Sequence, residues 1–272
     1  FLKRPAACGV KWVNVHARNP RRGLPSVMAV IVINDPATGF PLAIMDGLLI
    51  TKLRTAAAAA VAAQVLARRG SRAVGLIGCG AQADAQLEAL AAVFPLERVH
   101  VWGRRPHEAE GFCRWMRRRL PGPRYQAQER IEPCVREADI LVTLTPSRVP
   151  LVRRAWLKPG VHINAIGADA AGKQELDPAI LRHATVIVDH REQAIHAGEI
   201  NVPIARRQFR PQDIHATLGE ILLGRRRGRR SADEVTVFDA TGLAIHDVAL
   251  GYDLACRAQQ EHVGRRVALF TV

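Results

Sequence analysis

The sequence predicts an α/β fold with two lobes, one central and one assembled from both ends of the chain. Between residues 54 and 239, short apolar runs alternate with segments of helical spacing, which is typical of a parallel sheet with crossover helices. A glycine-rich turn follows the first of these runs. Residues 1–53 instead contain strands joined by a tight turn, and residues 240–272 contain a long helix. We therefore expect an α/β domain over 54–239 and a discontinuous α+β lobe from the two ends.

The discontinuous lobe is predicted from two strands and a terminal helix. Val27 to Ile33 and Pro41 to Met45 are β-like runs, and the turn residues 34–39 between them predict an antiparallel pair. Thr55 to Arg69 is rich in alanine, which predicts a helix next to this lobe. Leu243 to Val263 is expected to form a long helix that packs on the first segment.

The central domain is predicted from apolar runs of strand length and from helical spacing. Asp177 and Pro178 open one short helix, as N-cap and first helical residue. The predicted strands cover 73–77, 98–102, 139–144, 161–166, 184–188 and 235–238. The predicted helices cover 82–94, 106–120, 177–183 and 213–223.

The composition indicates a globular protein. Of the 272 residues 48% are apolar, and no apolar run approaches the roughly 20 residues that span a bilayer. Residues 1–5 lack the apolar core of a signal peptide, and the chain starts without Met inside an apparent element, so we expect a missing N-terminal piece. The five cysteines are scattered and favour a reducing compartment, hence a cytoplasmic location.

The net charge of +14 does not by itself indicate a nucleic-acid partner. Of the 39 basic residues 34 are arginine, a bias typical of codon composition. The dense run at 225–230 lacks interleaved aromatic residues, so we interpret it as a solvated loop and expect no nucleic acid and no membrane as partner. No metal site is expected, because no second ligand accompanies His16 at metal spacing.

A phosphate-binding turn is the strongest local motif. Residues 74–83 have the G-x-G-x-x-A pattern between a strand and a helix. Gly78 permits the tight turn, Gly80 lets the backbone approach a pyrophosphate, and Ala81 and Gln82 open the helix whose N–H groups face the phosphates. The motif predicts a Rossmann dinucleotide-binding domain. A purely structural glycine-rich turn is the alternative.

The choice between NAD and NADP is made at the end of the next strand. An acid there usually binds the ribose hydroxyls of NAD, but this chain has Gly103, followed by Arg104 and Arg105. A guanidinium suits a 2′-phosphate. We expect NAD or NADP as cofactor, with NADP(H) at least accepted. Solvated arginines are the alternative.

Several motifs, spread over nearly the whole chain, together resemble those of one family. They are KWVNVH (11–16), RGLPSVM (22–28), LRTAA (53–57), IGCGAQA (77–83), TLTPS (143–147), NAIGAD (164–169), GKQEL (172–176), GEINV (198–202) and FDATGLA (238–244). The set resembles the ornithine cyclodeaminase/μ-crystallin family, most of all its archaeal-type alanine dehydrogenase branch. The resemblance implies a homodimer, a central Rossmann lobe, and a discontinuous lobe that binds substrate and dimerises.

The resemblance also implies a substrate site of two arginines, a lysine and an aspartate. Lys11, Arg54 and Asp169 match three of them, while the other arginine would lie upstream of Phe1. Arg54 offers a planar fork for a carboxylate, Lys11 can hold that carboxylate or polarise a carbonyl or imine, and Asp169 follows a strand end where it can exchange a proton. Ordinary surface or turn residues are the alternatives.

Further side chains are expected to line the cofactor. Lys173 is expected either to contact the cofactor or to pair with Glu175. The other expected lining residues are Thr143, Thr145, Ser147, Ala165, Gly167, Thr241 and Gly242.

The leading hypothesis is reversible oxidation of L-alanine to pyruvate and ammonia, with hydride transfer to the nicotinamide and Asp169 as acid/base. The alternatives are a cyclodeaminase that forms proline from ornithine, a reductase of cyclic imines such as pyrroline-2-carboxylate, and a μ-crystallin-like dinucleotide- or ligand-binding protein without activity.

Overall fold

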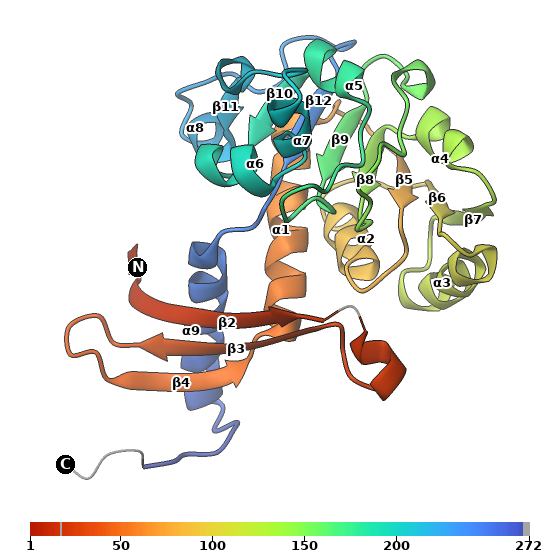
Figure 1. The fold of residues 1–272 in the computed structure, drawn as a ribbon. Coiled ribbons are helices and arrows are strands. Elements are labelled where there is room, and N and C mark those ends of the chain that lie inside the picture. The colour runs from red at the N-terminus through yellow and green to blue at the C-terminus, as the bar shows by residue number, and fades with distance from the viewer. Residues whose placement is uncertain (17, 269–272) are drawn as a thin grey trace. The chain divides into compact units, whose positions relative to one another are not determined.

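The computed structural model describes residues 1–16 and 18–268. The chain divides into two compact units (Figure 1). The first unit comprises Phe1–Arg54 and Leu243–Val272, and the second comprises Thr55–Gly242.

The second unit is built on one eight-stranded sheet in which every strand pair is parallel. Its strands are β5 (Ala73–Ile77), β6 (Arg98–Trp102), β7 (Arg124–Gln128), β8 (Ile140–Thr143), β9 (His162–Ala165), β10 (Thr185–Val188), β11 (Ala216–Thr217) and β12 (Thr236–Asp239). Their order is β11-β10-β12-β9-β8-β5-β6-β7. The strands that follow β5 in the chain are added first on one side of it and then, from β8 onward, on the other side, so the order reverses between β5 and β8. In such sheets ligands bind at the reversal, beyond the carboxyl ends of the strands.

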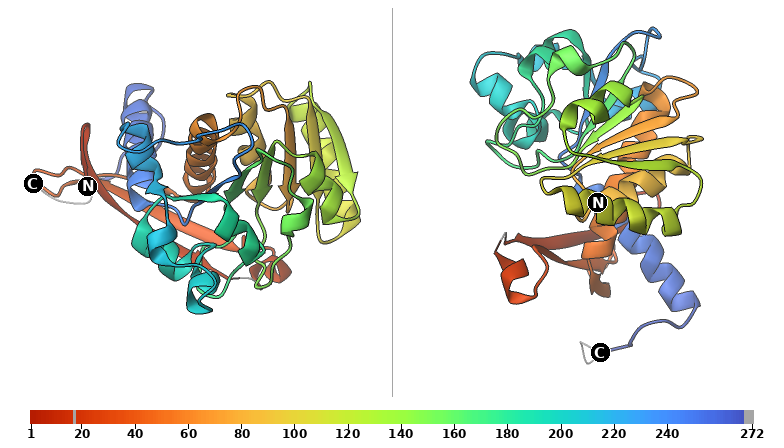
Figure 2. Two further views of the ribbon diagram at one scale, coloured as in Figure 1. Left: turned by 90° about the horizontal axis from the view of Figure 1, so that it is seen from above. Right: turned by 90° about the vertical axis from the view of Figure 1, so that its right-hand side faces the viewer.

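Helices cover both faces of this sheet, and each face has its own core (Figure 2). Strand alternation divides β5 between them, because Val74 and Leu76 pack into one core and Ile77 into the other. The helices are α2 (Ala83–Ala91), α3 (Pro106–Arg119), α4 (Ile131–Glu137), α5 (Pro178–His183), α6 (Arg191–Ala197), α7 (Asn201–Ala205) and α8 (Leu218–Leu222), with short 3₁₀ turns at Arg154–Trp156 and Pro211–Asp213.

The predicted helix over 213–223 is wrong in its first half. Ala216–Thr217 is the edge strand β11, and the helix α8 begins only at Leu218. Thr217 ends the strand and also caps the helix, since its hydroxyl accepts a hydrogen bond from the Glu220 amide while Glu220 accepts from the Thr217 amide. This capping box fixes the start of the helix.

The alanine-rich helix α1 is longer than predicted. It runs from Leu48 to Leu66, so Arg54 lies within the helix and does not precede it. Contrary to expectation, α1 is long and apolar enough to span a membrane by length and composition alone. Its second half nevertheless contributes to the core of the second unit, where Ala59, Ala62 and Ala63 are fully buried.

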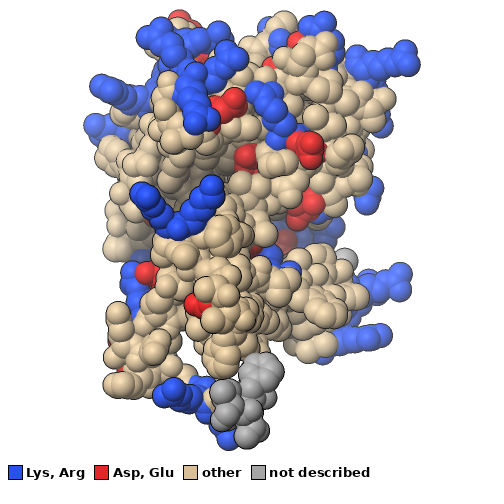
Figure 3. All heavy atoms as spheres, turned by 90° about the vertical axis from the view of Figure 1, so that its left-hand side faces the viewer, with Lys and Arg blue, Asp and Glu red and all other residues tan. Residues whose placement is uncertain are grey.

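The arginine run at 225–230 is not solvated throughout. Arg225, Arg226 and Arg227 are exposed, but Arg229 donates to the carbonyl oxygens of Leu66 (2.6 Å) and Gly160 (3.0 Å). Arg229 therefore closes a loop of the second unit. Figure 3 shows one face of the molecule, on which Lys and Arg gather more densely than Asp and Glu, in line with the net charge.

The first unit contains a four-stranded antiparallel sheet in the order β1-β2-β3-β4, where only one strand pair was predicted. Its strands are β1 (Leu2–Lys3), β2 (Ala6–Val15), β3 (Val27–Asn34) and β4 (Pro41–Asp46), and its helix is α9 (Ala244–Gln260). Ala7, Ile31 and Ile33 point from one face of the sheet into a core with Val248 of α9. The terminal helix thus packs on the N-terminal segment, as predicted.

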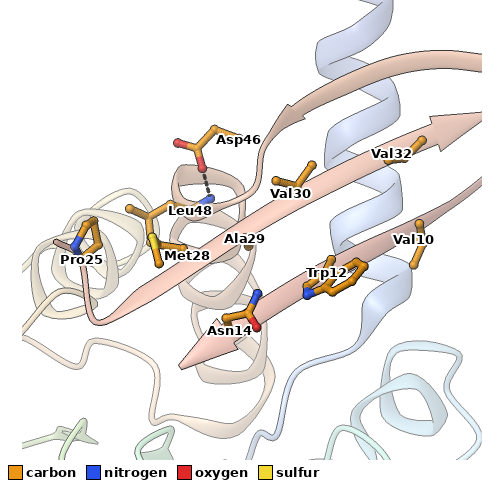
Figure 4. Close-up of a pocket in the computed structure, with 10 residues that line it drawn as sticks. All are labelled: Val10, Trp12, Asn14, Pro25, Met28, Ala29, Val30, Val32, Asp46 and Leu48. Carbon is orange, nitrogen blue, oxygen red and sulfur yellow. Dashed lines mark hydrogen bonds between the residues drawn. The ribbon is translucent and has the colours of Figure 1, made fainter. Parts of the chain in front are cut away.

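The opposite face of this sheet is apolar and exposed. Trp12, Val30 and Ile44 are 73%, 48% and 62% exposed. A hollow of about 800 Å³ lies over this face (Figure 4). It is lined by Val10, Trp12, Asn14, Pro25, Met28, Ala29, Val30, Val32, Asp46 and Leu48.

Candidate active site

The turn between β5 and α2 has the geometry that its sequence predicts. Gly78 has a φ of +109°, and its amide donates to the Trp102 carbonyl at 2.8 Å. A Cβ atom at Gly78 would lie 3.1 Å from both the Leu144 oxygen and the Thr145 Cγ2. At Gly80 a Cβ would meet no described atom within 4 Å, so the backbone is open to a ligand. Ala81 and Gln82 complete the turn, and Gln82 is the N-cap residue of the nine-residue helix α2.

The end of β6 carries no acid of the kind that usually binds NAD, and a side chain there would require Cys79 to move. A Cβ at Gly103 would lie 2.8 Å from the Cys79 sulfur. Of the two arginines that follow, Arg105 forms an ion pair with Glu108 at the start of α3. Arg104 is exposed and forms no hydrogen bond or ion pair with any described residue. Arg104 is therefore the guanidinium that remains available to an anion.

Thr143 is the buried last residue of β8, and the loop that follows it is held by a residue that the sequence analysis did not select. Glu175 Oε1 accepts hydrogen bonds from the amide and the hydroxyl of Thr145, both at 2.7 Å. Ser147 donates its hydroxyl to the Val149 carbonyl at 2.7 Å. The signal for Glu175 was present in the GKQEL motif, but no role followed from its spacing.

The loop after β9 carries Asp169 in an exposed position. Ala165 ends the strand, and the Gly167 amide donates to Glu175 Oε2 at 3.1 Å. The Asp169 side chain is 54% exposed, and its Oδ1 pairs with the ammonium of Lys173. Lys173 thus pairs with Asp169 and not with Glu175, because Glu175 is fully buried and its oxygens already accept hydrogen bonds from Thr145 and Gly167.

Three buried carboxylates follow one another through the second unit. Glu199 accepts the amides of Glu175 (2.9 Å) and Leu176 (2.6 Å), and Asp239 at the end of β12 accepts the Glu199 amide (2.9 Å). Burial raises the pKa of Glu175 to about 7 and that of Asp239 to about 7. The hydrogen bonds that each of these two carboxylates accepts oppose the increase. Burial, and next the charge of Glu175, raise the pKa of Glu199 well above its usual value.

Thr241 and Gly242, the last residues of the second unit, are fixed by Asp189. The Thr241 hydroxyl donates to Asp189 Oδ1 at 3.1 Å, and the Gly242 amide donates to Oδ2 at 2.6 Å. Asp189 directly follows β10, so these residues are held at the carboxyl edge of the sheet. A carboxylate immediately after an apolar strand was the signal that could have identified Asp189.

The first unit brings Lys11 and Arg54 together on one carboxylate. Lys11 Nζ lies 2.7 Å from Asp247 Oδ2, and Arg54 Nε lies 3.1 Å from Oδ1. The side chains of both cations are 11% exposed and that of Asp247 only 1%. Burial lowers the pKa of Lys11, while the hydrogen bond to Asp247 opposes this shift. Nothing in the sequence pattern of α9 distinguished Asp247 from an ordinary helical aspartate.

This cluster has a formal charge of +1 and can accept one further anion. The Nη atoms of Arg54 donate to no described residue, so its terminal fork is available to a carboxylate. Asp169 belongs to the second unit. The predicted convergence of Lys11, Arg54 and Asp169 on one substrate therefore stays a prediction.

Comparison with known proteins agrees with the family resemblance of the sequence motifs. The ornithine cyclodeaminase/mu-crystallin family model matches residues 2–258. The alanine dehydrogenase of Archaeoglobus fulgidus is 47% identical over 264 residues, which are 97% of this chain and 81% of that protein. An archaeal alanine dehydrogenase dimer with bound NAD superposes with a TM-score of 0.93 at 47% identity, over 97% of this chain and 82% of the other. Thermococcus litoralis Δ1-pyrroline-2-carboxylate reductase, in complex with NADH and L-proline, gives 0.95 at 36% identity, over 98% and 83%.

Proposed function

The chain belongs to the ornithine cyclodeaminase/mu-crystallin family, and from this premise we propose that it is an NAD(P)-dependent alanine dehydrogenase that converts L-alanine reversibly to pyruvate and ammonia. The observation that carries the proposal is the 47% identity with the A. fulgidus alanine dehydrogenase over 97% of this chain. The cation cluster of the first unit and the glycine turn of the second are consistent with that chemistry.

Lys11 and Arg54 hold the substrate carboxylate. Asp247 neutralises one of their two charges and keeps both side chains extended toward a common point. An amino-acid or 2-oxo-acid carboxylate supplies the missing negative charge and can accept two parallel hydrogen bonds from the Arg54 fork. Anchoring the carboxylate orients the α-carbon, which is catalysis by positioning.

The glycine turn and the strand ends of the second unit hold the dinucleotide. A bound nicotinamide dinucleotide supplies the hydride acceptor for alanine oxidation. The backbone of Gly78 and Gly80 and the N-terminus of α2 fit a pyrophosphate, because Gly80 is open and the helix N-terminus attracts anions. Thr143 and Ala165 are fully buried and lie beneath this edge. The rest of the edge is lined by Thr145, Ser147, Gly167, Thr241 and Gly242.

Asp169 exchanges the proton. Its half-exposed carboxylate can take a proton from the substrate amine, or from the water that attacks the imine carbon. Lys173 holds Oδ1 of this carboxylate and leaves Oδ2 for the transfer. We expect Asp169→Asn to abolish turnover while dinucleotide binding survives, and near-normal rates in this variant would refute the acid/base role.

NADP(H) is accepted through Arg104. Its guanidinium forms no hydrogen bond or ion pair with any described residue, and the Cys79 sulfur would have to move to admit a side chain at position 103. A 2′-phosphate can pair with this guanidinium. The test compares kcat/KM for NADPH and NADH in the wild type and in Arg104→Ala. Equal or better kinetics with NADH in the wild type would contradict this assignment.

Two copies of the chain pair through the exposed face of the β1–β4 sheet. Trp12, Val30 and Ile44 form a continuous apolar surface, since Trp12 lies opposite Val30 and Val32 opposite Ile44 in the sheet. Large exposed apolar patches on soluble proteins mark association sites. We infer a homodimer in the cytoplasm, the latter from cysteines that are all free thiols.

One assay distinguishes the candidate activities. An alanine dehydrogenase consumes NAD(P)H with pyruvate and ammonium. A cyclodeaminase releases ammonia from ornithine without net change in the cofactor. A reductase consumes NAD(P)H with Δ1-pyrroline-2-carboxylate, the candidate favoured next by the T. litoralis likeness. A binding protein gives none of these signals. Absence of pyruvate- and ammonium-dependent oxidation of either reduced cofactor would overturn the proposal.

A further inference from the structure

Glu175 links two loops that end at the cofactor side of the sheet. One of its oxygens holds Thr145, after β8, and the other holds Gly167, after β9. Glu175 is fully buried, although a buried carboxylate is costly unless its oxygens are hydrogen-bonded. The proposed chemistry leaves this residue without a task.

The fit around Glu175 is tight on both sides. A Cβ at Gly167 would lie 2.3 Å from Glu175 Oε2 and 2.4 Å from the Thr145 carbonyl oxygen, so only glycine allows this approach. On the other side, Thr145 Cγ2 lies 3.1 Å from the Cβ position at Gly78, in the phosphate turn. The Thr145 methyl group therefore occupies the space that a side chain at position 78 would need.

The donors around Glu175 also fix the direction of the Thr145 hydroxyl. Two amides and one hydroxyl donate to Glu175, which suits a carboxylate because an ionised carboxyl only accepts. The proton of the Thr145 hydroxyl is committed to Glu175, and its oxygen accepts the Ser147 amide at 3.3 Å, so one lone pair is left for a ligand. A hydroxyl or amide donor of the dinucleotide is the complementary group.

Glu175 is itself held from behind. Glu199 accepts its amide and that of Leu176, and Asp239 accepts the amides of Glu199 (2.9 Å) and Ile200 (3.2 Å). The backbone that presents Glu175 is thereby tied to the end of β12. Such outer hydrogen bonds orient the groups that touch a ligand.

We propose that Glu175 is a positioning residue for the dinucleotide, which sets the Thr145 hydroxyl as an acceptor and holds the loops after β8 and β9 against the phosphate turn. The inference rests on the proposed dinucleotide site. It assigns the buried carboxylates Glu175, Glu199 and Asp239 to cofactor binding rather than to stability alone.

The test is a double-mutant cycle on dinucleotide affinity, measured by NAD(P)H fluorescence with the full chain. Glu175→Gln keeps the volume, but its amide NH2 opposes a backbone or hydroxyl donor. We expect the Kd to rise about tenfold, as for loss of one hydrogen bond to a charged group, with KM for pyruvate within threefold of wild type. Thr145→Val should weaken binding similarly, and Glu175→Gln should add little in that background. Thr145→Ser keeps the hydroxyl and should retain most of the affinity.

Glu234→Gln is the matched control. Glu234 also accepts a threonine hydroxyl, that of Thr185, but at the amino end of β10. Glu234→Gln should therefore leave the Kd unchanged. An unchanged Kd in Glu175→Gln, or additive effects with Thr145→Val, would overturn the inference while pyruvate turnover upholds the proposed function. If Glu175→Gln does not fold, the comparison of Thr145→Val with Thr145→Ser replaces it, and equal affinities of these two variants would overturn the inference. A wild type that binds no dinucleotide would overturn the proposed function itself.

Discussion

Replacing Arg54 by methionine should remove most of the affinity for the substrate carboxylate. Methionine retains an apolar side chain of similar length at a site that is only 11% exposed. Asp247 keeps Lys11 as its partner at 2.7 Å, so no buried charge is left unpaired. The perturbation is therefore confined to the guanidinium.

The magnitude follows from the two free Nη atoms. Each hydrogen bond between charged groups contributes about 1.5–3 kcal/mol, and two such bonds to a carboxylate are lost. Because Lys11 still attracts the anion, we take the lower limit of about 3 kcal/mol, which corresponds to about a 100-fold loss of kcat/KM for pyruvate. Arg54→Lys keeps the charge without the fork, and should lose about tenfold.

The assay follows the oxidation of NAD(P)H at saturating ammonium while pyruvate is varied, and the dinucleotide Kd is measured separately. The Kd should stay at its wild-type value in Arg54→Met. Arg257→Met is the control, because Arg257 is an exposed arginine of the same unit whose ion pair among the described residues is with Asp253 on its own helix. A kcat/KM for pyruvate within threefold of wild type would refute the carboxylate role of Arg54.

Three further predictions follow from the two units. Asp247→Asn leaves two nearly buried cations without a counter-charge and should lower the free energy of unfolding by about 3 kcal/mol in urea titrations, whereas exposed Asp253→Asn should not. Burial lowers the pKa of His162 to about 3. Below pH 6.5 the unfolded chain takes up a proton on this residue that the folded chain does not, so the stabilising contribution present above pH 6.5 is lost toward pH 3. The free energy of unfolding should therefore fall by up to about 1.4 kcal/mol per pH unit more in wild type than in His162→Gln. Trp12→Glu should give a monomer in sedimentation, and Trp115→Glu in α3 should not; a dimeric Trp12→Glu would exclude this sheet face as the interface.

Much of the second unit was predictable because its signals are local. Ala73–Ile77 and Arg98–Trp102 were predicted with their observed bounds. The first is a continuous apolar segment, as is typical of a buried parallel strand, and the second is recognised by its Val, Val and Trp. Both edge strands were missed, β11 because two residues carry no periodicity and β7 because its sequence, RYQAQ, is mostly polar. The start of α1 was misplaced because residues 48–54 mix apolar and basic side chains, and because the capping role of Asp46, which accepts the Leu48 amide at 2.8 Å, was not recognised.

The residues that bind or position ligands likewise divide into those that local sequence signals predict and those that only the folded structure reveals. The order of amino acids was enough to predict the phosphate turn, the absence of an acid at Gly103, and the candidates Lys11, Arg54 and Asp169, because strand ends, glycine spacing and family motifs are written along the chain. The folded chain was needed to show that Asp247, 236 residues from Lys11, joins it to Arg54, and that Glu175 holds Thr145 and Gly167. Such partners meet through strand register and helix packing, and a carboxylate acquires its role from the donors that the fold places around it.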